Sequence, residues 1–506
     1  MNRSRSRTRR WRPARAAGFA VGVLTTVSLA AACSTGETAA TSSTSTTTTT
    51  TTTAPLPVPE VDATDEEPPA PEWVVQVGGA DDDSLRDVAA RDDELVAVGH
   101  TEGEPGGAGN GGADALSVLV TTEAEVTGVL QSGSELDDIA TSVGSSGSAT
   151  LACGQTTGGI GGLPGGAEDG WCAPVGPDGS LGTTHQQGGT ESDSILGVAL
   201  ATDGEFGYAG GYTLGLFPGA SDTSAGQLGN GDALVWQIGA DGTPRWIRQF
   251  GTAAADRGRA VSVTDDGDGL IVGETGGDLE GPSNGGTDAF LARFDRDGIP
   301  RFVRQFGSAE EDSASAVAAG GEPTRGTETF VVAGHTEGAL APALGGELTD
   351  PADAPRADGA EPAPTNAGGT DAVLWAMDPG GDERWTVQLG STGADEATAV
   401  AIDGSTVLVA GTTSGALDTT GAPSSGGLDG FLAAVDLDTG ALRWITQFGS
   451  EGDETVGGMT ITEDGLVVVA GSTTAAMGDN VNAGRSDGFL IAFPLPAVGG
   501  AAASAL

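Results

Sequence analysis

Carboxylates are the side chains best placed to do chemistry in this sequence, because Asp and Glu make up 71 of its 506 residues and His only three. Seven Asp residues each begin an apolar stretch, at Asp114, Asp169, Asp232, Asp288, Asp371, Asp429 and Asp487. A catalytic site is asymmetric, whereas a residue that recurs in every repeat usually holds the repeat together. We therefore expect these carboxylates to accept backbone N–H bonds and to fix the preceding loops. A ring of metal or sugar sites, one per repeat, is the alternative.

Three Asp/Gly segments have oxygen ligands at spacings that suit Ca²⁺, namely Asp265–Gly269, Asp295–Gly298 and Asp436–Gly440. None has the late bidentate acid that completes a calcium loop. Hairpin turns select Asp and Gly for their own reasons. The segments predict turns, with Ca²⁺ as the alternative, and we predict no other cofactor and no defined metal ligand.

No catalytic residue is predicted. His100 and His335 occupy the middle of a Gly-x-Thr motif, and the same slot elsewhere holds Gln155, Tyr212, Glu274, Thr412 and Ser472. A slot this tolerant is not a shared metal ligand. Ser283 lies in a Gly-x-Ser-x-Gly sequence, but a nucleophile elbow needs a strand before it and a helix after it, and this segment is predicted to be a loop.

The elements that carry these residues belong to a sevenfold repeat of about 60 residues. Residues 429–450 show the unit as two apolar runs around an Asp/Gly turn, which is a β-hairpin signal. Its second run contains a Gln followed two residues later by Gly, and the copies lie at Gln76, Gln131, Gln186, Gln249, Gln305, Gln388 and Gln447. The Asp-to-Gln spacing is nearly constant, whereas the Gly-x-Thr-to-Asp spacing ranges from 15 to 37. The period suits a four-stranded antiparallel unit with one variable loop.

The two ends of the repeat region predict a closed ring. The first copy starts at Trp73 with the second half of a hairpin, and the last copy ends at Phe493 with a first half. Together they complete one unit, and strand exchange of this kind leaves no exposed sheet edge. The sequence therefore predicts an all-β, seven-bladed β-propeller over residues 73–494.

The motifs at 285–298, 304–308 and 331–336 resemble the bacterial seven-bladed β-propeller repeat found in lipoproteins. The resemblance covers about 73–493, is closest in the fourth to seventh copies, and implies a fold but little about activity. Residues 435–444 also resemble the tryptophan-docking motif of quinone-dependent dehydrogenase propellers. Only this copy has the full form, so we interpret its Trp444 as blade packing.

The first 32 residues have the form of a signal peptide, with seven Arg before a small-residue apolar stretch. The sequence Leu29 to Cys33 resembles a bacterial lipobox, although Leu lies four residues before Cys33, and ordinary signal cleavage is the alternative. Arg9 and Arg10 leave twin-arginine export open. We predict lipidation at Cys33, and a location at the outer face of the bacterial cytoplasmic membrane or the cell surface.

Segments outside the repeat are predicted to be disordered: a Thr/Pro-rich tether at 33–72, an insertion at about 341–367 and a tail at 495–506. The two other cysteines, Cys153 and Cys172, fall at core positions of two strands in one blade. An exported compartment permits a disulfide between them, and two buried thiols are the alternative.

The formal net charge of −49 excludes binding to nucleic acid or to a bare anionic membrane. We expect a monomer that touches the membrane only through its anchor. The predicted function is a non-catalytic binding or scaffold module for a protein or glycan of the cell envelope. The alternatives are a propeller enzyme, either a hydrolase or a quinone-dependent oxidoreductase, with a site in the central channel, and a structural scaffold with a dedicated protein partner.

Overall fold

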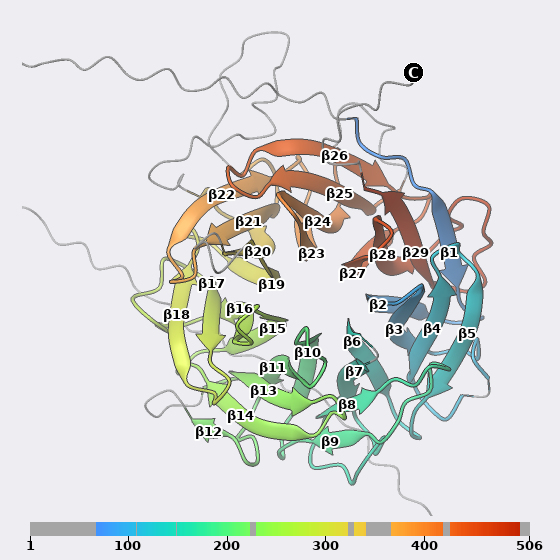
Figure 1. Cartoon of the computed structure of the whole chain (residues 1–506), viewed down its shortest axis with the longest axis horizontal. Coiled ribbons are helices and arrows are strands. Elements are labelled where there is room, and N and C mark those ends of the chain that lie inside the picture. The colour runs from blue at the N-terminus through green and yellow to red at the C-terminus, as the bar shows by residue number, and fades with distance from the viewer. Residues whose placement is uncertain are drawn as a thin grey trace, which may run out of the picture. The chain divides into compact units, whose positions relative to one another are not determined.

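A computed structural model of the chain describes residues 67–107, 109–147, 149–222, 229–321, 328–340, 366–417 and 426–495. These residues form seven small antiparallel sheets arranged as a β-propeller (Figure 1). The predicted fold class and blade number are therefore confirmed. Across the described ranges, no helix is long and apolar enough to cross a membrane.

Six blades are built from consecutive strands, with the first strand innermost. The first blade contains β2 (Asp83–Arg91), β3 (Glu94–Thr101), β4 (Asp114–Thr121) and β5 (Val126–Ser132). The second contains β6 (Asp138–Ser146), β7 (Ala149–Thr156), β8 (Asp169–Pro174) and β9 (His185–Gln187). The third contains β10 (Asp193–Leu200), β11 (Phe206–Thr213), β13 (Asp232–Gly239) and β14 (Pro244–Phe250), with a short parallel strand β12 (Ser221–Asp222) beside β14. The fourth blade contains β15 (Asp256–Val263), β16 (Gly269–Thr275), β17 (Asp288–Phe294) and β18 (Pro300–Phe306). The fifth contains β19 (Asp312–Gly320), β20 (Thr329–Thr336), β21 (Asp371–Met377) and β22 (Glu383–Leu389). The sixth contains β23 (Asp395–Asp403), β24 (Thr406–Thr413), β25 (Asp429–Asp436) and β26 (Leu442–Phe448).

The seventh blade joins the two ends of the repeat region. It contains β27 (Glu454–Ile461), β28 (Leu466–Thr473) and β29 (Asp487–Pro494), and its outer strand is β1 (Trp73–Val77). β1 pairs antiparallel with β29, from Trp73 opposite Ala492 to Val77 opposite Gly488 (Figure 1). Strand exchange closes the ring as the two half-hairpins predict.

Every inner strand has a β-bulge at the same place in its pairing with the second strand. In the first blade the register shifts between Leu85 and Asp87. The Gly of each Gly-x-Thr motif faces this irregularity, and a Cβ on Gly99 would overlap the carbonyl oxygen of Ser84. The bulge explains why this position is Gly in all seven copies.

The hydrophobic core lies between neighbouring blades. One cluster combines Leu270 and Leu291 of the fourth blade with Phe330 and Trp375 of the fifth, and all four are buried. Outer-strand tryptophans also connect blades, because the indole N–H of Trp385 donates to the carbonyl of Leu437 in the next blade at 2.9 Å. Trp73 and Trp246 donate in the same way to Thr122 and Arg296. The repeated Trp position thus packs one blade against the next.

Candidate functional site at the inner strands

The recurring Asp of each third strand anchors a loop. Asp288 is fully buried, and its Oδ2 accepts hydrogen bonds from Gln305 Nε2 at 2.7 Å and from the Asn284 backbone N–H at 2.9 Å. The same Gln–Asp bond is present in all seven blades at 2.7–2.9 Å. Gln305 also donates to Gly277 O and accepts from Leu279 N, so it fixes the loop after Gly-x-Thr. These contacts fit the expected role of the seven Asp residues in holding the blades.

A second acid begins each inner strand and is equally buried, at Asp83, Asp138, Asp193, Asp256, Asp312, Asp395 and Glu454. Glu454 accepts from the Ser450 backbone N–H at 2.8 Å and from the Thr473 hydroxyl, the Thr of Gly-x-Thr, at 2.6 Å. Burial raises the pKa of Asp312, and the nearby Asp288 carboxylate raises it further. Both recurring acids of each blade therefore serve the frame.

Between these constant positions, each blade carries one cross-strand pair that differs from blade to blade. The pair joins the residue after the inner-strand acid to the middle residue of Gly-x-Thr. The seven pairs are Ser84–His100, Ile139–Gln155, Ser194–Tyr212, Arg257–Glu274, Ser313–His335, Glu396–Thr412 and Thr455–Ser472. Directly opposite residues in an antiparallel pair project from the same face. The strands that carry them surround the centre of the ring (Figure 1), and we call these residues the inner pairs.

The fourth blade has the most highly charged inner pair. Glu274 accepts from Arg259 Nη2 at 2.8 Å and from the Ser313 hydroxyl of the next blade at 2.8 Å, while Arg257 Nη1 lies 3.5 Å away. The Arg257 guanidinium also lies 5.4 Å from the ring centre of Tyr212 in the preceding blade. Side chains from three successive blades thus meet, and Arg257 remains 45% exposed. A guanidinium in this position can present a planar set of N–H donors to a ligand.

A second arginine lines the inner strands in the first blade. Arg86 Nε donates to Nδ1 of His100 at 3.4 Å, and within the described ranges no carboxylate pairs with Arg86. Burial, with the Arg86 charge adding to it, lowers the pKa of His100 to about 4. His100 is therefore neutral near pH 7 and can accept this bond. The arrangement orients Arg86 without neutralising it.

The sequence did not identify the inner pairs as a candidate site. The variability of the Gly-x-Thr slot argues against one shared metal ligand. The same variability, within a frame of constant Asp, Gly and Thr, is what an asymmetric site at the centre of a repeat ring requires. The variable middle position of Gly-x-Thr can be found in the sequence. The inner-strand residue that lies opposite it can be identified only when the strand register is known.

The three Asp/Gly segments behave as turns. Oδ1 of Asp295 accepts from the backbone N–H groups of Asp297 and Ile299 at 3.0 and 2.8 Å. Asp436 caps its own turn through Thr439 N at 3.0 Å and binds Arg443 at 2.6 Å. The described ranges contain no cluster of three His, Cys, Asp or Glu arranged to hold a metal ion.

The Ser283 segment is a loop before β17, as expected. Its hydroxyl donates to the backbone carbonyl of Gly285 at 3.3 Å and accepts from that residue's N–H at 3.2 Å. No helix follows it, because the chain enters β17 at Asp288.

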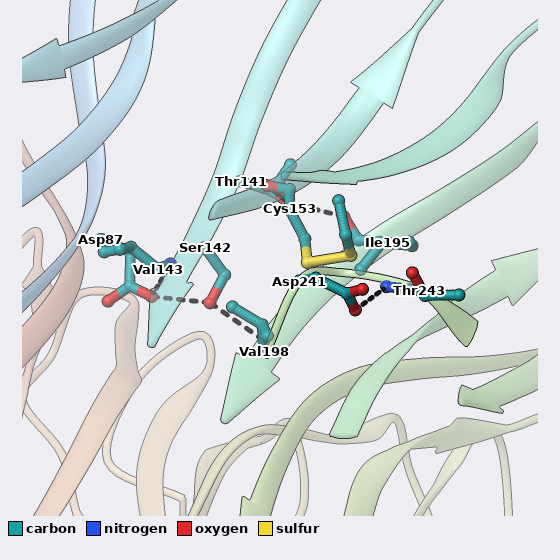
Figure 2. The surroundings of a disulfide bond; sticks show 10 residues. Asp87, Thr141, Ser142, Val143, Cys153, Ile195, Val198, Asp241 and Thr243 are labelled. Atoms are coloured by element: carbon teal, nitrogen blue, oxygen red, sulfur yellow. Dashed lines mark hydrogen bonds between the residues drawn. A yellow bond between two sulfur atoms is a disulfide. The ribbon is translucent and has the colours of Figure 1, made fainter. Parts of the chain in front are cut away.

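The structure contains a disulfide between Cys153 and Cys172, which lie directly opposite each other on β7 and β8 and are fully buried (Figure 2). Nearby, Asp87 Oδ2 accepts from the Ser142 hydroxyl at 2.7 Å, and the same hydroxyl accepts from Val198 N at 3.1 Å (Figure 2). This chain of bonds connects the inner strands of three blades.

Several predicted features lie outside the described residues. They are the signal peptide, Cys33, the tether up to residue 66, insertion residues 341–365 and the tail from residue 496. Their assignments stay predictions.

Comparison with known proteins gives one curated relative and many structural neighbours. The regulatory protein FlaEY of Caulobacter vibrioides is 27% identical over 325 residues, or 60% of this chain and 32% of that protein, so the chain spans about a third of the relative's length. The periplasmic gluconolactonase PpgL of Pseudomonas aeruginosa is 13% identical over 84% of this chain and 100% of its own, with a TM-score of 0.44. An acylaminoacyl peptidase of Pyrococcus horikoshii is 10% identical over 81% and 52%, with a TM-score of 0.40. Likenesses this distant carry no inference about activity. No family profile matches the sequence.

Proposed function

We propose that the chain is an exported, lipid-anchored binding module whose inner pairs hold a protein segment or a glycan of the cell envelope. The observation that carries the proposal is the combination of a constant frame with seven different inner pairs. Fourteen recurring acids are committed to loops and strand ends, so the variable residues are free to differ. Binding sites of repeat proteins are built in this way, from variable positions on a constant scaffold.

The charge at the ring centre supports a polar ligand. Arg86 and Arg257 project from inner strands of a strongly acidic chain, and their guanidiniums are oriented by His100, Glu274 and Tyr212. A ligand with a carboxylate or a phosphate can accept two parallel hydrogen bonds from such a group. The arginines would then supply both affinity and orientation.

The test is a differential capture with the full-length exported protein. The native chain, an Arg86→Ala/Arg257→Ala double variant and an Arg443→Ala control are immobilised and exposed to solubilised bacterial envelope. Arg443 lies on the outer strand of the sixth blade and pairs with Asp436. We expect one saturable partner to be retained by the native chain and the control and lost by the double variant.

Two results would contradict this proposal: equal retention by all three proteins, or no saturable partner for any of them. A parallel capture in EDTA tests the calcium alternative, because loss of the partner there would require a divalent ion in the complex. Thermal unfolding of each variant shows whether the ring remains folded.

A further inference from the structure

A cavity of about 1020 Å³ lies where the fourth blade meets the fifth, and it is separate from the inner pairs. Its walls come from the turn before β16, from the β17–β18 turn with outer strand β18, and from the β21–β22 turn at Pro379 and Gly380. Two of the three Asp/Gly turns noted in the sequence, at Asp265–Gly269 and Asp295–Gly298, therefore meet at one cavity. Its volume is in the range of small-molecule sites.

The inner wall of the cavity is a buried ion-pair network centred on Arg293. Arg293 Nε donates to Asp268 Oδ2 at 2.9 Å, and Arg293 Nη1 donates to the carbonyl of Pro379 at 3.2 Å. The guanidinium also lies 3.8 Å from Glu328 and 5.4 Å from the ring centre of Phe330 in the fifth blade. The equivalent third-strand positions hold Leu119, Pro174, Gln237, Ala376, Ala434 and Ala492. Among the seven third strands, only that of the fourth blade carries an arginine at this position.

The outer wall offers accessible groups of both signs. Arg301 is 57% exposed and lies 3.5 Å from Asp268 and 3.8 Å from Asp295. Arg304 binds Glu280 at 2.7 Å and the carbonyl of Gly380 at 3.0 Å. The carboxylate of Asp297 is exposed on the rim. Hydrogen-bond donors and acceptors therefore both line the outer wall of the cavity.

The balance of charge selects the kind of ligand. The lining contains four arginines and five carboxylates, which leaves almost no net charge. A polyanion would be repelled by the carboxylates and by the acidic surface around them, and a cation would be repelled by the four guanidiniums. An apolar ligand would strip water from ion pairs and offer no hydrogen bonds in return. A hydroxyl group both donates and accepts, so a polyhydroxylated ligand satisfies both kinds of wall group.

We propose that this cavity is a second binding site, and that it takes an uncharged, polyhydroxylated ligand such as a neutral oligosaccharide segment. Carboxylates at Asp297 and Asp295 accept from sugar hydroxyls, while Arg301 and Arg304 donate to them. Arg293 forms a rigid inner wall, because it is held by Asp268 of its own blade and by Pro379 and Glu328 of the fifth blade. The site does not depend on the function proposed for the inner pairs.

The experiment uses the full-length protein and isothermal titration with five defined probes. Three are neutral: chitotetraose, cellotetraose and maltotetraose. Two are charged controls, tetragalacturonate and tetralysine. We expect saturable binding of at least one neutral probe, changing little between about 50 and about 300 mM NaCl, because salt screens only charged partners.

Variants place the binding in the cavity. Arg301→Ala and Asp297→Ala remove one exposed donor and one exposed acceptor, and each should weaken the neutral probe by about tenfold, equivalent to one decade in Kd. Arg443→Ala removes the arginine at the Arg301 position of the sixth-blade repeat, which lies away from the cavity, and should leave the affinity unchanged. Melting curves confirm that all three variants remain folded.

The titrations distinguish a cavity that binds neutral ligands from one that binds charged ligands or none. No binding of any neutral probe overturns the proposal, and so does neutral-probe binding that both cavity variants leave intact. Preferential binding of tetralysine or tetragalacturonate that the cavity variants abolish would identify the cavity as a site for charged ligands and would equally overturn it.

Discussion

In each blade, a recurring glycine lies directly beside a buried carboxylate. Gly188 follows Gln186 by two residues, and a Cβ there would overlap the carboxylate of Asp169, to which Gln186 Nε2 donates at 2.8 Å. Equivalent overlaps with the third-strand Asp occur at Gly78, Gly133, Gly251, Gly390 and Gly449, whereas a Cβ on Gly307 would overlap the carboxylate of Asp312. The recurring Gly is therefore a space requirement of the buried acid, and Gln, Gly and Asp form one structural unit.

Gly188→Ala should destabilise the protein by about 1–3 kcal/mol, because an added methyl must displace a buried, hydrogen-bonded carboxylate. Urea unfolding measures the effect. Gly281→Ala is the matched control, since its Cβ would meet no atom within 4 Å, and we expect it to be nearly neutral. Equal stability of the two variants would show that the carboxylate relocates without cost.

Asp87 gives the inner strands a pH-dependent contact. Burial raises the pKa of Asp87 to about 6, although bonds from Ser142, Val143 and Val88 oppose the shift. A raised folded-state pKa means that its contribution to stability is complete below the unfolded value of 3.8 and is lost as pH rises through about 6. The loss amounts to up to about 3 kcal/mol.

Asp87→Asn should therefore flatten the dependence of the unfolding free energy on pH between about 4 and 7, because Asn does not ionise. Chemical denaturation at several pH values measures this slope for the native chain and the variant. The comparison depends on slopes and holds whatever the absolute stability of the variant. Parallel slopes would assign the pH dependence to other groups.

At the level of strands and blades, contacts between neighbouring sheets hold the molecule together. The seventh blade makes this clearest, because its outer strand comes from the other end of the chain. Gln76 Nε2 donates to Asp487 Oδ2 at 2.9 Å, across 411 positions of sequence, as its counterparts do within a single hairpin. β1 therefore completes both a sheet and the Gln–Asp contact of that blade.

Removing the chain through Val77 should open the ring, because β29 then exposes an unpaired edge and Asp487 loses its Gln partner. We expect a lower melting temperature and self-association, measured by calorimetry and by light scattering after size exclusion. A truncation that ends before Trp73 keeps β1 and serves as the control. A monomeric, equally stable protein after the longer deletion would show that closure is dispensable.

The disulfide ties two neighbouring strands of the second blade across a separation of 19 residues. Cross-linking a loop of this size restricts the unfolded chain, which is worth about 3 kcal/mol. A Cys153→Ala/Cys172→Ala variant should unfold at lower temperature, and its melting should not respond to reductant, whereas the melting of the native chain should. An identical response of both proteins to reductant would contradict a stabilising bond.

The whole molecule carries far more acid than base, with 71 acidic residues against 22 basic ones. Such a charge keeps a protein soluble but disfavours the compact state through self-repulsion. Most of the acids lie within a closed ring, so their mutual repulsion is greater in the folded state than in an extended chain.

Raising NaCl from about 10 to about 500 mM should increase the melting temperature, because the Debye length falls from about 30 Å to only a few ångströms. Differential scanning calorimetry checks this, with an uncharged osmolyte as the control for effects unrelated to charge. A melting temperature that falls with NaCl would mean that attractive ion pairs, such as Arg293–Asp268, outweigh the net repulsion.

The amino-acid sequence alone determined the class, the blade number and the closure of the fold, because these follow from local patterns repeated at a fixed spacing. Alternation, Asp/Gly turns and half-hairpins at Trp73 and Phe493 are properties of neighbouring residues, and seven copies of a pattern reinforce one another. The loop-fixing role of Asp288 and its counterparts could be predicted for the same reason.

Only the tertiary structure decided which non-repeated residues meet. Arg257, Tyr212 and Ser313 come from three blades, and Arg293 meets Glu328 across a blade junction. Nothing local encodes these contacts, because they depend on strand register and on the rotation from one blade to the next. In a repeat ring, the role of the constant residues can be predicted from the sequence, because they recur at a fixed spacing. The variable residues form a site only when the closed ring brings them together.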